Sequence, residues 1–272
     1  TPAERYHLYC QWQMEEQLTA AARSSDGSGL FLDMPVGVHP HGFDTQRWPQ
    51  LFLHGLSSGA PPDAFFSLGQ DWECPPLHPE RGRESGHSYF AAALRRQMAH
   101  ARYLRVDHVM ALHRLFVIPV GAEPSAGTYL HYPAEESYAV LALESQRSRT
   151  AVVGEDLGTV PVGVRSSMRR HGVSRTWVFQ TTLGPRSRTL ATPVPAGAVA
   201  SINTHDMVPL AGFLEGRDID TRVETGQSTA EEAARARSAR ARLVARLTLL
   251  LTDDDGADPL PLRLLRCALR RM

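Results

Sequence analysis

The stretch PAEESYAVLALESQRSRTAVVGEDLGTVP, residues 133–161, decides the fold. Its first half predicts a helix over 133–149, because acids stand in the first turn and arginines in the last, which is the direction that the helix dipole favours. Ala151, Val152 and Val153 then form a short apolar run that predicts a buried strand. A helix that leads directly into a buried strand is the repeating unit of α/β proteins.

The same alternation of helix and strand extends in both directions from this stretch. Further helices are predicted over 88–101 and 162–172, and strands are predicted near residues 30, 103, 151, 176 and 199. Strands separated by helices at this spacing form a parallel sheet. Since no G-x-G-x-x-G motif follows the first strand, a dinucleotide-binding fold is disfavoured. The pattern predicts a (β/α) barrel with its active site at the C-terminal ends of the strands.

Two regions depart from this alternation. Residues 39–86 are rich in Pro, Gly, His and aromatic residues, and they predict a long loop region, which inside a compact domain is usually functional. Residues 228–272 predict C-terminal helices, of which the first begins with a capping box of Ser228 and Glu231. The sequence therefore predicts one barrel region over residues 1–272, with residues 39–86 as a long loop region inserted in it.

Composition disfavours several classes of protein. The 29 basic and 29 acidic residues balance, so neither nucleic acid nor a membrane is predicted as a partner. No apolar stretch approaches the roughly 20 residues that span a bilayer. The chain contains no lysine, which excludes Schiff-base chemistry and pyridoxal phosphate attachment by this chain alone. Three widely separated cysteines, Cys10, Cys74 and Cys267, predict reduced thiols in a cytoplasmic protein.

Acidic residues stand at the C-terminal ends of four of the predicted strands. They are Asp33, Asp107 beside Arg105 and His108, Glu155 with Asp156, and Asp206 beside His205. In a barrel these ends converge on one mouth, where the mutual repulsion of carboxylates is costly unless the site uses it. Paired carboxylates suit glycoside chemistry, in which one acid attacks the anomeric carbon while a second gives and then takes a proton.

Five sequence blocks resemble the signature blocks of the 4-alpha-glucanotransferase family, the amylomaltases or disproportionating enzymes. They are LDMPVGVHPHGFD (32–44), GAPPDAFFSLGQDW (59–72), LRVDHVMALHRLFVIP (104–119), VVGEDLGTVP (152–161) and INTHDM (202–207). They occur in the family's order over residues 1–215. The resemblance implies an α/β fold, a partial TIM (β/α)8-type barrel with about five of the eight strands present and both ends of the family's barrel missing.

The resemblance also implies roles for individual residues. Asp107 matches the family's nucleophile, Glu155 its general acid/base, and Asp206 the aspartate that stabilises the distorted sugar in the transition state. The residues that bind substrate or orient the acids are implied in the same way; they are Arg105, His205, Asp33, Pro62, Asp63, Gln70 and Trp72.

The implied activity is the transfer of α-1,4-glucan segments between maltooligosaccharides, in the cytoplasm and as part of carbohydrate metabolism. The mechanism would be a retaining double displacement, for which about 5–5.5 Å should separate the carboxyls of Asp107 and Glu155. This chemistry needs no metal and no organic cofactor.

Other interpretations remain open at this stage. Asp107 could be only a structural ion-pair partner of Arg105, and Asp33 only a turn cap. The His and acid pairs could be ligands in a metal-dependent barrel hydrolase, although no H-x-H motif follows the first strand and a carbamylated lysine is impossible. The chain could also be a truncated glucan-binding fragment without turnover, because three strands of a closed barrel cannot be placed.

Overall fold

The computed structural model describes residues 1–25, 28–63, 66–184, 192–251 and 258–270. The chain divides into two compact units. The first unit comprises Thr1–Pro61 and Gln70–Arg175, and the second comprises Pro62–Gly69 and Thr176–Met272. Each unit has a hydrophobic core of its own.

A parallel sheet organises the first unit. Its strands are β1 (Leu30–Met34), β4 (Ala101–Val106), β7 (Ala151–Gly154) and the first residues of β8 (Ser174–Val178), hydrogen-bonded in that order. In the register, Asp33 lies opposite Arg105, and Gly154 lies opposite Arg175. These strands and β9 of the second unit are the five that the sequence predicts, and the α/β fold class is confirmed.

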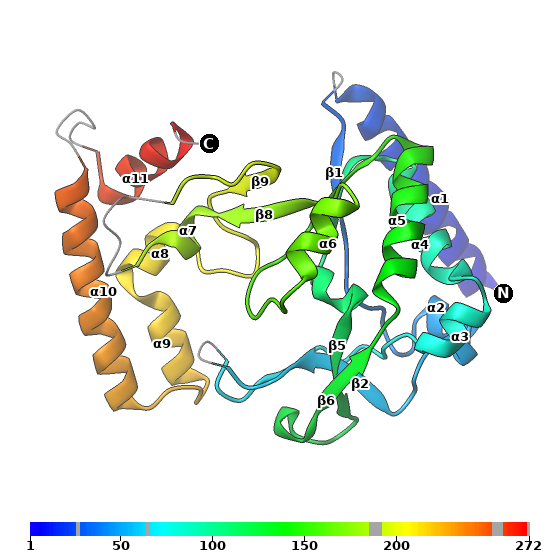
Figure 1. The fold of residues 1–272 in the computed structure, drawn as a ribbon, viewed down its shortest axis with the longest axis horizontal. Coiled ribbons are helices and arrows are strands. Elements are labelled where there is room, and N and C mark those ends of the chain that lie inside the picture. The colour runs from blue at the N-terminus through cyan, green and yellow to red at the C-terminus, as the bar shows by residue number, and fades with distance from the viewer. Residues whose placement is uncertain (26–27, 64–65, 185–191, 252–257, 271–272) are drawn as a thin grey trace. The chain divides into compact units, whose positions relative to one another are not determined.

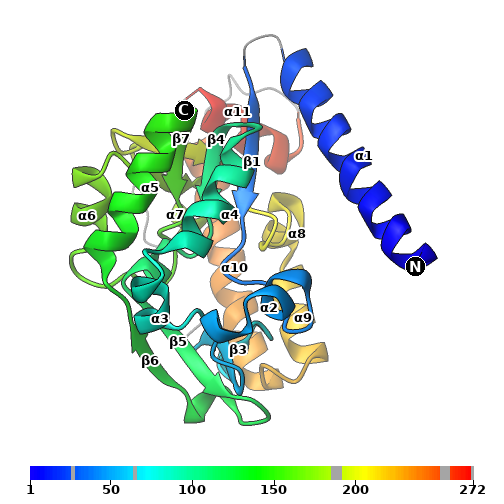
Figure 2. The same ribbon diagram turned by 90° about the vertical axis from the view of Figure 1, so that its right-hand side faces the viewer.

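Helices cover one face of this sheet. Helices α4 (Ser88–Met98) and α5 (Ala134–Ser148) lie side by side against it, and α6 (Val164–Arg170) follows β7 (Figures 1 and 2). Because successive strand residues point to opposite faces, Leu104 and Val106 of β4 are buried beneath the helices, whereas Tyr103 and Arg105 point away from them. The helix-facing side of the sheet is therefore the core, and the other side carries the charged residues.

Shortening Leu104 to alanine is expected to lower the free energy of unfolding by about 2–5 kcal/mol, because the side chain is 0% exposed and its loss leaves a cavity. Urea denaturation should show a lower midpoint with an unchanged slope. Leu143 on α5 is 48% exposed and provides the control, since Leu143→Ala should change stability by less than about 0.5 kcal/mol. Equal losses in the two variants would contradict this description of the core.

A second, antiparallel sheet also belongs to the first unit. Its strands are β2 (Leu56–Ala60), β3 (Gln70–Asp71), β5 (Arg114–Pro119) and β6 (Thr128–His131), in the order β3-β2-β5-β6. The sequence predicts residues 39–86 as a long loop, and in this respect the prediction is wrong: two of these strands lie there, with α2 (Phe43–Arg47), the 3-10 helix η1 (Pro49–Leu51) and α3 (Pro79–Glu84). The 3-10 helices η2 (Val109–Leu112) and η3 (Pro124–Ala126) flank β5.

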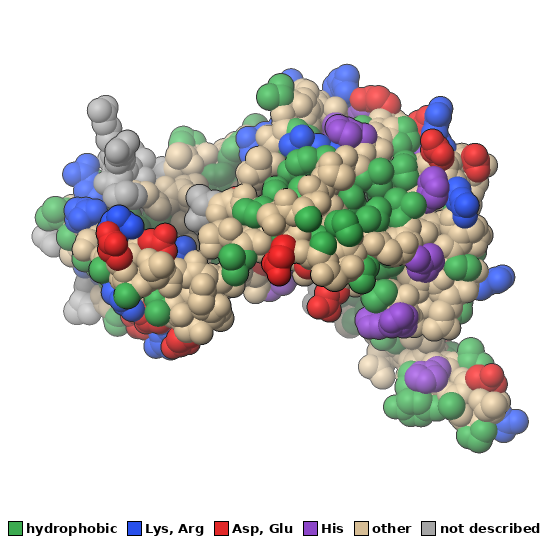
Figure 3. All heavy atoms as spheres, turned by 90° about the horizontal axis from the view of Figure 1, so that it is seen from below, with side chains coloured by type: hydrophobic (Ala, Val, Ile, Leu, Met, Phe, Trp, Pro, Cys, Tyr) green, Lys and Arg blue, Asp and Glu red, His purple; other side chains and the backbone are tan. Residues whose placement is uncertain are grey.

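Helix α1 (Pro2–Ser24) begins at a capping box of Thr1 and Glu4. Glu15 joins it to Arg96 of α4 (2.5 Å) and to His100, which lies between α4 and β4 (3.1 Å). None of its residues is buried, and hydrophobic side chains are exposed along its N-terminal half (Figure 3). Its attachment to the first unit therefore depends mainly on charged groups.

The second unit contains the rest of β8, then α7 (Phe179–Thr182), β9 (Ala198–Ser201), α8 (Leu210–Glu215), α9 (Arg217–Glu224), α10 (Ala230–Leu250) and α11 (Leu260–Leu269). Trp177, Phe179 and Leu247 are among the buried side chains that form its core. The capping box of α10 consists of Thr229 and Glu232, one residue later than the predicted Ser228 and Glu231. Over the described parts of the chain, every helix is too short or too polar to cross a membrane.

Candidate active site

Arg105 holds two of the predicted acids together on the face of the sheet away from the helices. Its Nη1 donates to both oxygens of Asp33, at 2.8 and 2.7 Å, and its Nη2 lies 2.8 Å from Oδ1 of Asp107. The pairing of β1 with β4 places Asp33 opposite Arg105, and Asp107 follows directly after β4. The structure therefore brings together Asp33, Arg105 and Asp107, as the sequence predicts.

Burial alone would lower the pKa of Arg105, but the hydrogen bond to Asp33 and the charges of Asp107, Asp33 and Glu155 raise it above its ordinary value. The guanidinium thus remains a fixed positive charge between two carboxylates. Asp107 is only partly covered, with 31% of its side chain exposed.

Glu155 follows β7 and is buried, with 8% of the residue exposed. Its carboxylate accepts the backbone N–H of His108 at Oε2 (3.1 Å) and that of Leu157 at Oε1 (2.8 Å). Burial raises the pKa of Glu155 to about 7, and the charge of Asp107 adds to this, while the two N–H groups and Arg105 act in the opposite direction. Glu155 is therefore close to half-protonated at neutral pH, as a group that both gives and takes a proton requires.

This raised pKa has a consequence for stability. In the unfolded chain Glu155 ionises near its ordinary pKa of 4.5, whereas in the folded chain it keeps its proton up to about pH 7. Folding is therefore disfavoured progressively as the pH rises through this window, by about 3 kcal/mol once the pH exceeds 7. Between pH 4.5 and pH 8, the free energy of unfolding of Glu155→Gln is therefore expected to rise by this amount relative to that of the wild type. Urea denaturation of both proteins at the two pH values measures the difference. Parallel pH dependences in the two proteins would contradict the assignment.

His108 and Leu157 are partners of Glu155 that the sequence analysis did not recognise, and His108 has an unusual backbone. It adopts a left-handed conformation (φ 44°, ψ 60°), and its backbone N–H points to the Glu155 carboxylate. Burial lowers the pKa of its imidazole to about 4, so the ring is neutral at pH 7. A backbone donor carries no signal in the side-chain pattern, and the only hint in the sequence is the position of His108 directly after Asp107.

The predicted loop residues are divided between the units. Gln70 and Trp72 lie in the first unit, where the Trp72 ring packs edge-on against His108, with ring centroids 5.1 Å apart. The Trp72 indole N–H donates to Oε1 of Gln70 at 3.3 Å. Pro62 and Asp63 belong to the second unit, and Oδ1 of Asp63 accepts the backbone N–H of Phe66 at 2.7 Å. Trp72 is therefore a neighbour of the acid cluster through His108.

His205 and Asp206 follow β9 in the second unit. Their side chains are 70% and 67% exposed, and Nε2 of His205 lies 3.4 Å from Oδ1 of Asp206. Both residues come after a strand, as the sequence predicts, and both side chains are open to solvent. Their participation with Asp107 and Glu155 in one site stays a prediction. Within the described ranges, no group of three His, Cys, Asp or Glu side chains is arranged to hold a metal ion.

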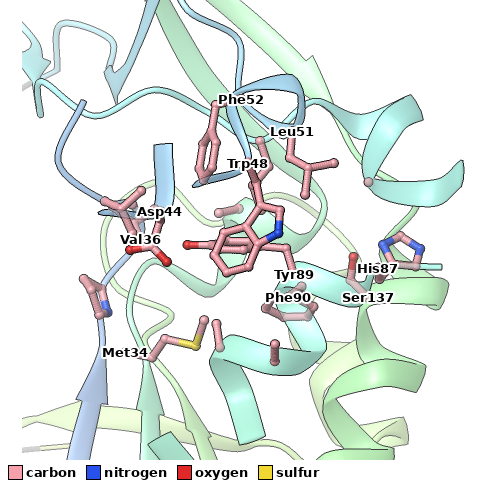
Figure 4. A pocket seen from close by; sticks show the side chains of 18 of the residues that line it. Met34, Val36, Asp44, Trp48, Leu51, Phe52, His87, Tyr89, Phe90 and Ser137 are labelled. Carbon is pink, nitrogen blue, oxygen red and sulfur yellow. The ribbon is translucent and has the colours of Figure 1, made fainter. Parts of the chain in front are cut away.

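A cavity of about 570 Å³ lies in the first unit on the helix-facing side of β1 and β4. Aromatic side chains from the segment after β1 and from α4 line it (Figure 4). Met34 and Val106 line it too, and they alternate along their strands with Asp33 and Arg105, which point to the other face. Asp107 and His108 border it, but Asp33, Arg105 and Glu155 do not. The acid cluster, where the titratable groups converge, is therefore the candidate active site.

Comparisons with known proteins agree on one family. The family model described as 4-alpha-glucanotransferase matches residues 2–254. The 4-alpha-glucanotransferase of Mycobacterium tuberculosis is 37% identical over 266 residues, which is 93% of this chain and 37% of that protein. The 4-alpha-glucanotransferase of Haemophilus influenzae is 35% identical over 220 residues, covering 79% of this chain and 32% of that protein.

The crystal structure of amylomaltase from Corynebacterium glutamicum is similar to the structure as well as to the sequence. The TM-score is 0.77 at 34% sequence identity, over 90% of this chain and 36% of that chain. The likeness agrees with a partial TIM-type barrel. The chain spans about a third of the length of the relatives that it matches.

Proposed function

Because the chain belongs to the 4-alpha-glucanotransferase family of glycoside hydrolases, we propose that it transfers α-1,4-glucan segments between maltooligosaccharides by a retaining double displacement. One observation supports this activity for the residues of this chain. Arg105 holds Asp107 in a charged pair, while the neighbouring Glu155 is buried and has its pKa raised to about 7. A carboxylate paired with an arginine, beside a carboxyl group with a raised pKa, suits the roles of nucleophile and proton donor.

In the first half of the reaction, Glu155 gives its proton to the glycosidic oxygen of the donor. The bond between this oxygen and the anomeric carbon breaks, and a carboxylate oxygen of Asp107 forms an ester with that carbon. The shorter glucan leaves with the proton, and Glu155 is left ionised. Arg105 supports this step because its ion pair with Asp107 orients the carboxylate before attack.

In the second half, the 4-hydroxyl of another glucan attacks the same carbon and displaces Asp107. Glu155 takes the proton of this hydroxyl, and a new α-1,4 bond forms with the configuration of the old one. Both residues return to their starting protonation states. The reaction needs no metal and no organic cofactor, since the two carboxyl groups supply the nucleophile and the proton.

The remaining predicted residues take supporting roles in this proposal. Asp206 stabilises the distorted sugar in the transition state, and His205 binds a hydroxyl of the same ring. Asp33 orients Arg105, whose Nη1 donates to both of its carboxylate oxygens. Pro62, Asp63, Gln70 and Trp72 line the groove for the acceptor; the contact of Trp72 with His108 supports its place near the acids.

We further propose that the partners are neutral maltooligosaccharides and that the protein acts in the cytoplasm. Balanced charge supports the first proposal, because it offers no large field to attract nucleic acid. Three cysteines that are free thiols, Cys10, Cys74 and Cys267, support the second.

Incubation of the chain with maltotriose, followed by separation of the products by length, tests the function. Transfer should give glucose together with maltopentaose and longer glucans, because a maltosyl group moves to a second maltotriose. Glucose and maltose alone would mean hydrolysis and would contradict transfer. Binding of maltotriose without any product would favour the truncated glucan-binding fragment, which the chain's span of about a third of its relatives keeps as the alternative.

A further inference from the structure

Asp156, the residue after Glu155, has no part in the reaction proposed above, and yet its side chain is completely buried. Its Oδ2 accepts the Nε–H of Arg165 at 2.7 Å and that of Arg175 at 2.8 Å. Arg165 also donates through Nη2 to the backbone carbonyl of Asp156 at 3.2 Å. A buried carboxylate is tolerated only when it is paired and hydrogen-bonded in this way, so the arrangement is built into the fold.

Through its two arginines, Asp156 holds the segment that follows β7 in place. On the β4 side, the backbone of Glu155 is fixed by two hydrogen bonds, from its N–H to Val106 O (2.9 Å) and from Val109 N–H to its carbonyl (3.0 Å). On the β8 side, the register of the sheet ends with Gly154 opposite Arg175. Beyond the last backbone pair of β7 and β8, the ion pair between Asp156 and Arg175 thus still links the two strands. Arg165, which lies in α6, links Asp156 to that helix.

Leu157 connects the ion-paired Asp156 to the carboxylate of Glu155. Its backbone N–H follows Asp156 directly and donates to Oε1 of Glu155 at 2.8 Å. The direction of this N–H is set by the peptide that joins residues 156 and 157, whose carbonyl is the one that Arg165 binds. A shift of Asp156 therefore moves one of the two backbone donors on the Glu155 carboxylate, while the other, from His108, is held by a different segment.

We propose that Asp156, clamped by Arg165 and Arg175, is a positioning residue that holds the Leu157 N–H on the acid/base carboxylate of Glu155. The proposal deepens the proposed function and rests on it. Glu155 must meet the glycosidic oxygen in one geometry to give its proton and in nearly the same geometry to recover it. A carboxylate that loses one of its two backbone donors is free to turn away from that geometry.

The choice of glycosyl donor and acceptor distinguishes a misplaced Glu155 carboxylate from a general loss of active protein. With α-maltosyl fluoride, the bond from carbon to fluorine breaks without protonation, because fluoride is a good leaving group. With azide as the acceptor, the bond to nitrogen forms without loss of a proton, and Asp107 leaves as a carboxylate. Neither step uses Glu155, whereas both steps with maltotriose do.

The variants Asp156→Asn, Arg165→Gln and Arg175→Gln should be compared on these two donor systems. For Asp156→Asn we expect the kcat on maltotriose to fall by about 100-fold with little change in KM, the order of effect of a misplaced catalytic group. Turnover of α-maltosyl fluoride with azide should stay within about threefold of the wild type, since that reaction bypasses the misplaced group. The arginine variants, whose side chains are 52% and 32% exposed, keep the test available if Asp156→Asn does not fold.

Glu144 offers a matched control in the same unit. It is also a buried carboxylate held by two arginines, with Arg95 at 2.7 and 3.0 Å and Arg147 at 3.0 Å, but it lies on α5 beside α4. Glu144→Gln should cost stability as Asp156→Asn does, and it should lower turnover of the two donor systems equally. Equal losses on both donor systems in Asp156→Asn would overturn the proposal and leave Asp156 a purely structural residue.

A second readout does not depend on turnover. As the pH is raised through the titration of Glu155, the backbone amide resonances of Leu157 and His108 should both shift in ¹⁵N spectra of the wild type. Asp107 and Arg105 are the charged groups that face Glu155, and both remain in Asp156→Asn. In this variant the Leu157 resonance should no longer follow the titration while that of His108 still does. If Leu157 follows it unchanged, the proposal fails, even where the wild type shows no transfer and the proposed function has failed separately.

Discussion

Glu155→Gln is expected to lower transfer from maltotriose by about 10²- to 10⁴-fold, the contribution of a positioned acid/base. Glutamine keeps the shape of the side chain and an oxygen for the N–H groups of His108 and Leu157, but it has no proton to give. The loss should therefore be in kcat, with the fold and substrate binding preserved. Initial rates of glucose release from maltotriose, measured over a range of concentrations, separate the two parameters.

The pH profile of the wild type completes this expectation. Since Glu155 must be protonated for the first half of the reaction, kcat/KM should fall as the pH rises through about 7, the pKa to which burial raises this group. Transfer that continues undiminished to pH 9, or a Glu155→Gln variant within tenfold of the wild type, would remove Glu155 from its assigned role.

Asp107→Asn is expected to have the larger effect, a loss of about 10⁴-fold or more, because removal of the nucleophile leaves no route to the covalent intermediate. Its substitution also removes a negative charge that raises the pKa of Glu155, so the pKa of Glu155 should move below about 7 in this variant. Product analysis with maltotriose measures the first effect, and titration of the Leu157 amide resonance measures the second.

The matched control for Asp107→Asn is Asp33→Asn. Asp33 bonds the same arginine, at 2.7 and 2.8 Å, but it lies one strand away and attacks nothing in this account. Its loss should lower activity far less than the loss of Asp107. Comparable losses would mean that the charge cluster acts as a unit and that Asp107 has no separate role as nucleophile.

The sequence was sufficient to predict the parallel sheet, because its strands carry strong local signals. The run from Ala151 to Val153 is apolar and stands directly after a helix, so its place in the sheet could be read from pattern alone. The antiparallel sheet escaped prediction because β2 reads LSSGA, a segment of small and polar residues typical of turns. It becomes a strand through pairing with the apolar β5, which no local signal in β2 reveals.

The capping box of α10 shows how closely competing signals can lie. Ser228 with Glu231 and Thr229 with Glu232 both have the required spacing, and the pattern alone does not choose between them. In the structure, Thr229 accepts the N–H of Glu232 and Glu232 accepts that of Thr229. The helix therefore begins one residue later than predicted.

The parts of the candidate site that are made of side chains could be predicted from the sequence, whereas the backbone hydrogen-bond donors could not. Asp33, Arg105 and Asp107 could be brought together from the sequence, since parallel neighbours end at one edge of the sheet. The backbone donors to Glu155 could not be predicted. The direction of the His108 N–H depends on a left-handed backbone conformation, which a histidine in the sequence does not indicate. The pairing of Asp156 with Arg175 depends on the register of β7 with β8, which was likewise hidden.

The measurement that tests the account most directly is the identification of the covalent intermediate. Glu155→Gln treated with α-maltosyl fluoride should form the Asp107 ester, since fluoride leaves without a proton, but should release it slowly to a sugar acceptor for want of a base. Mass spectrometry of peptic fragments should then find one maltosyl group on the peptide that contains Asp107. An unmodified protein that still consumes the fluoride, or a maltosyl group on another carboxylate, would contradict the account.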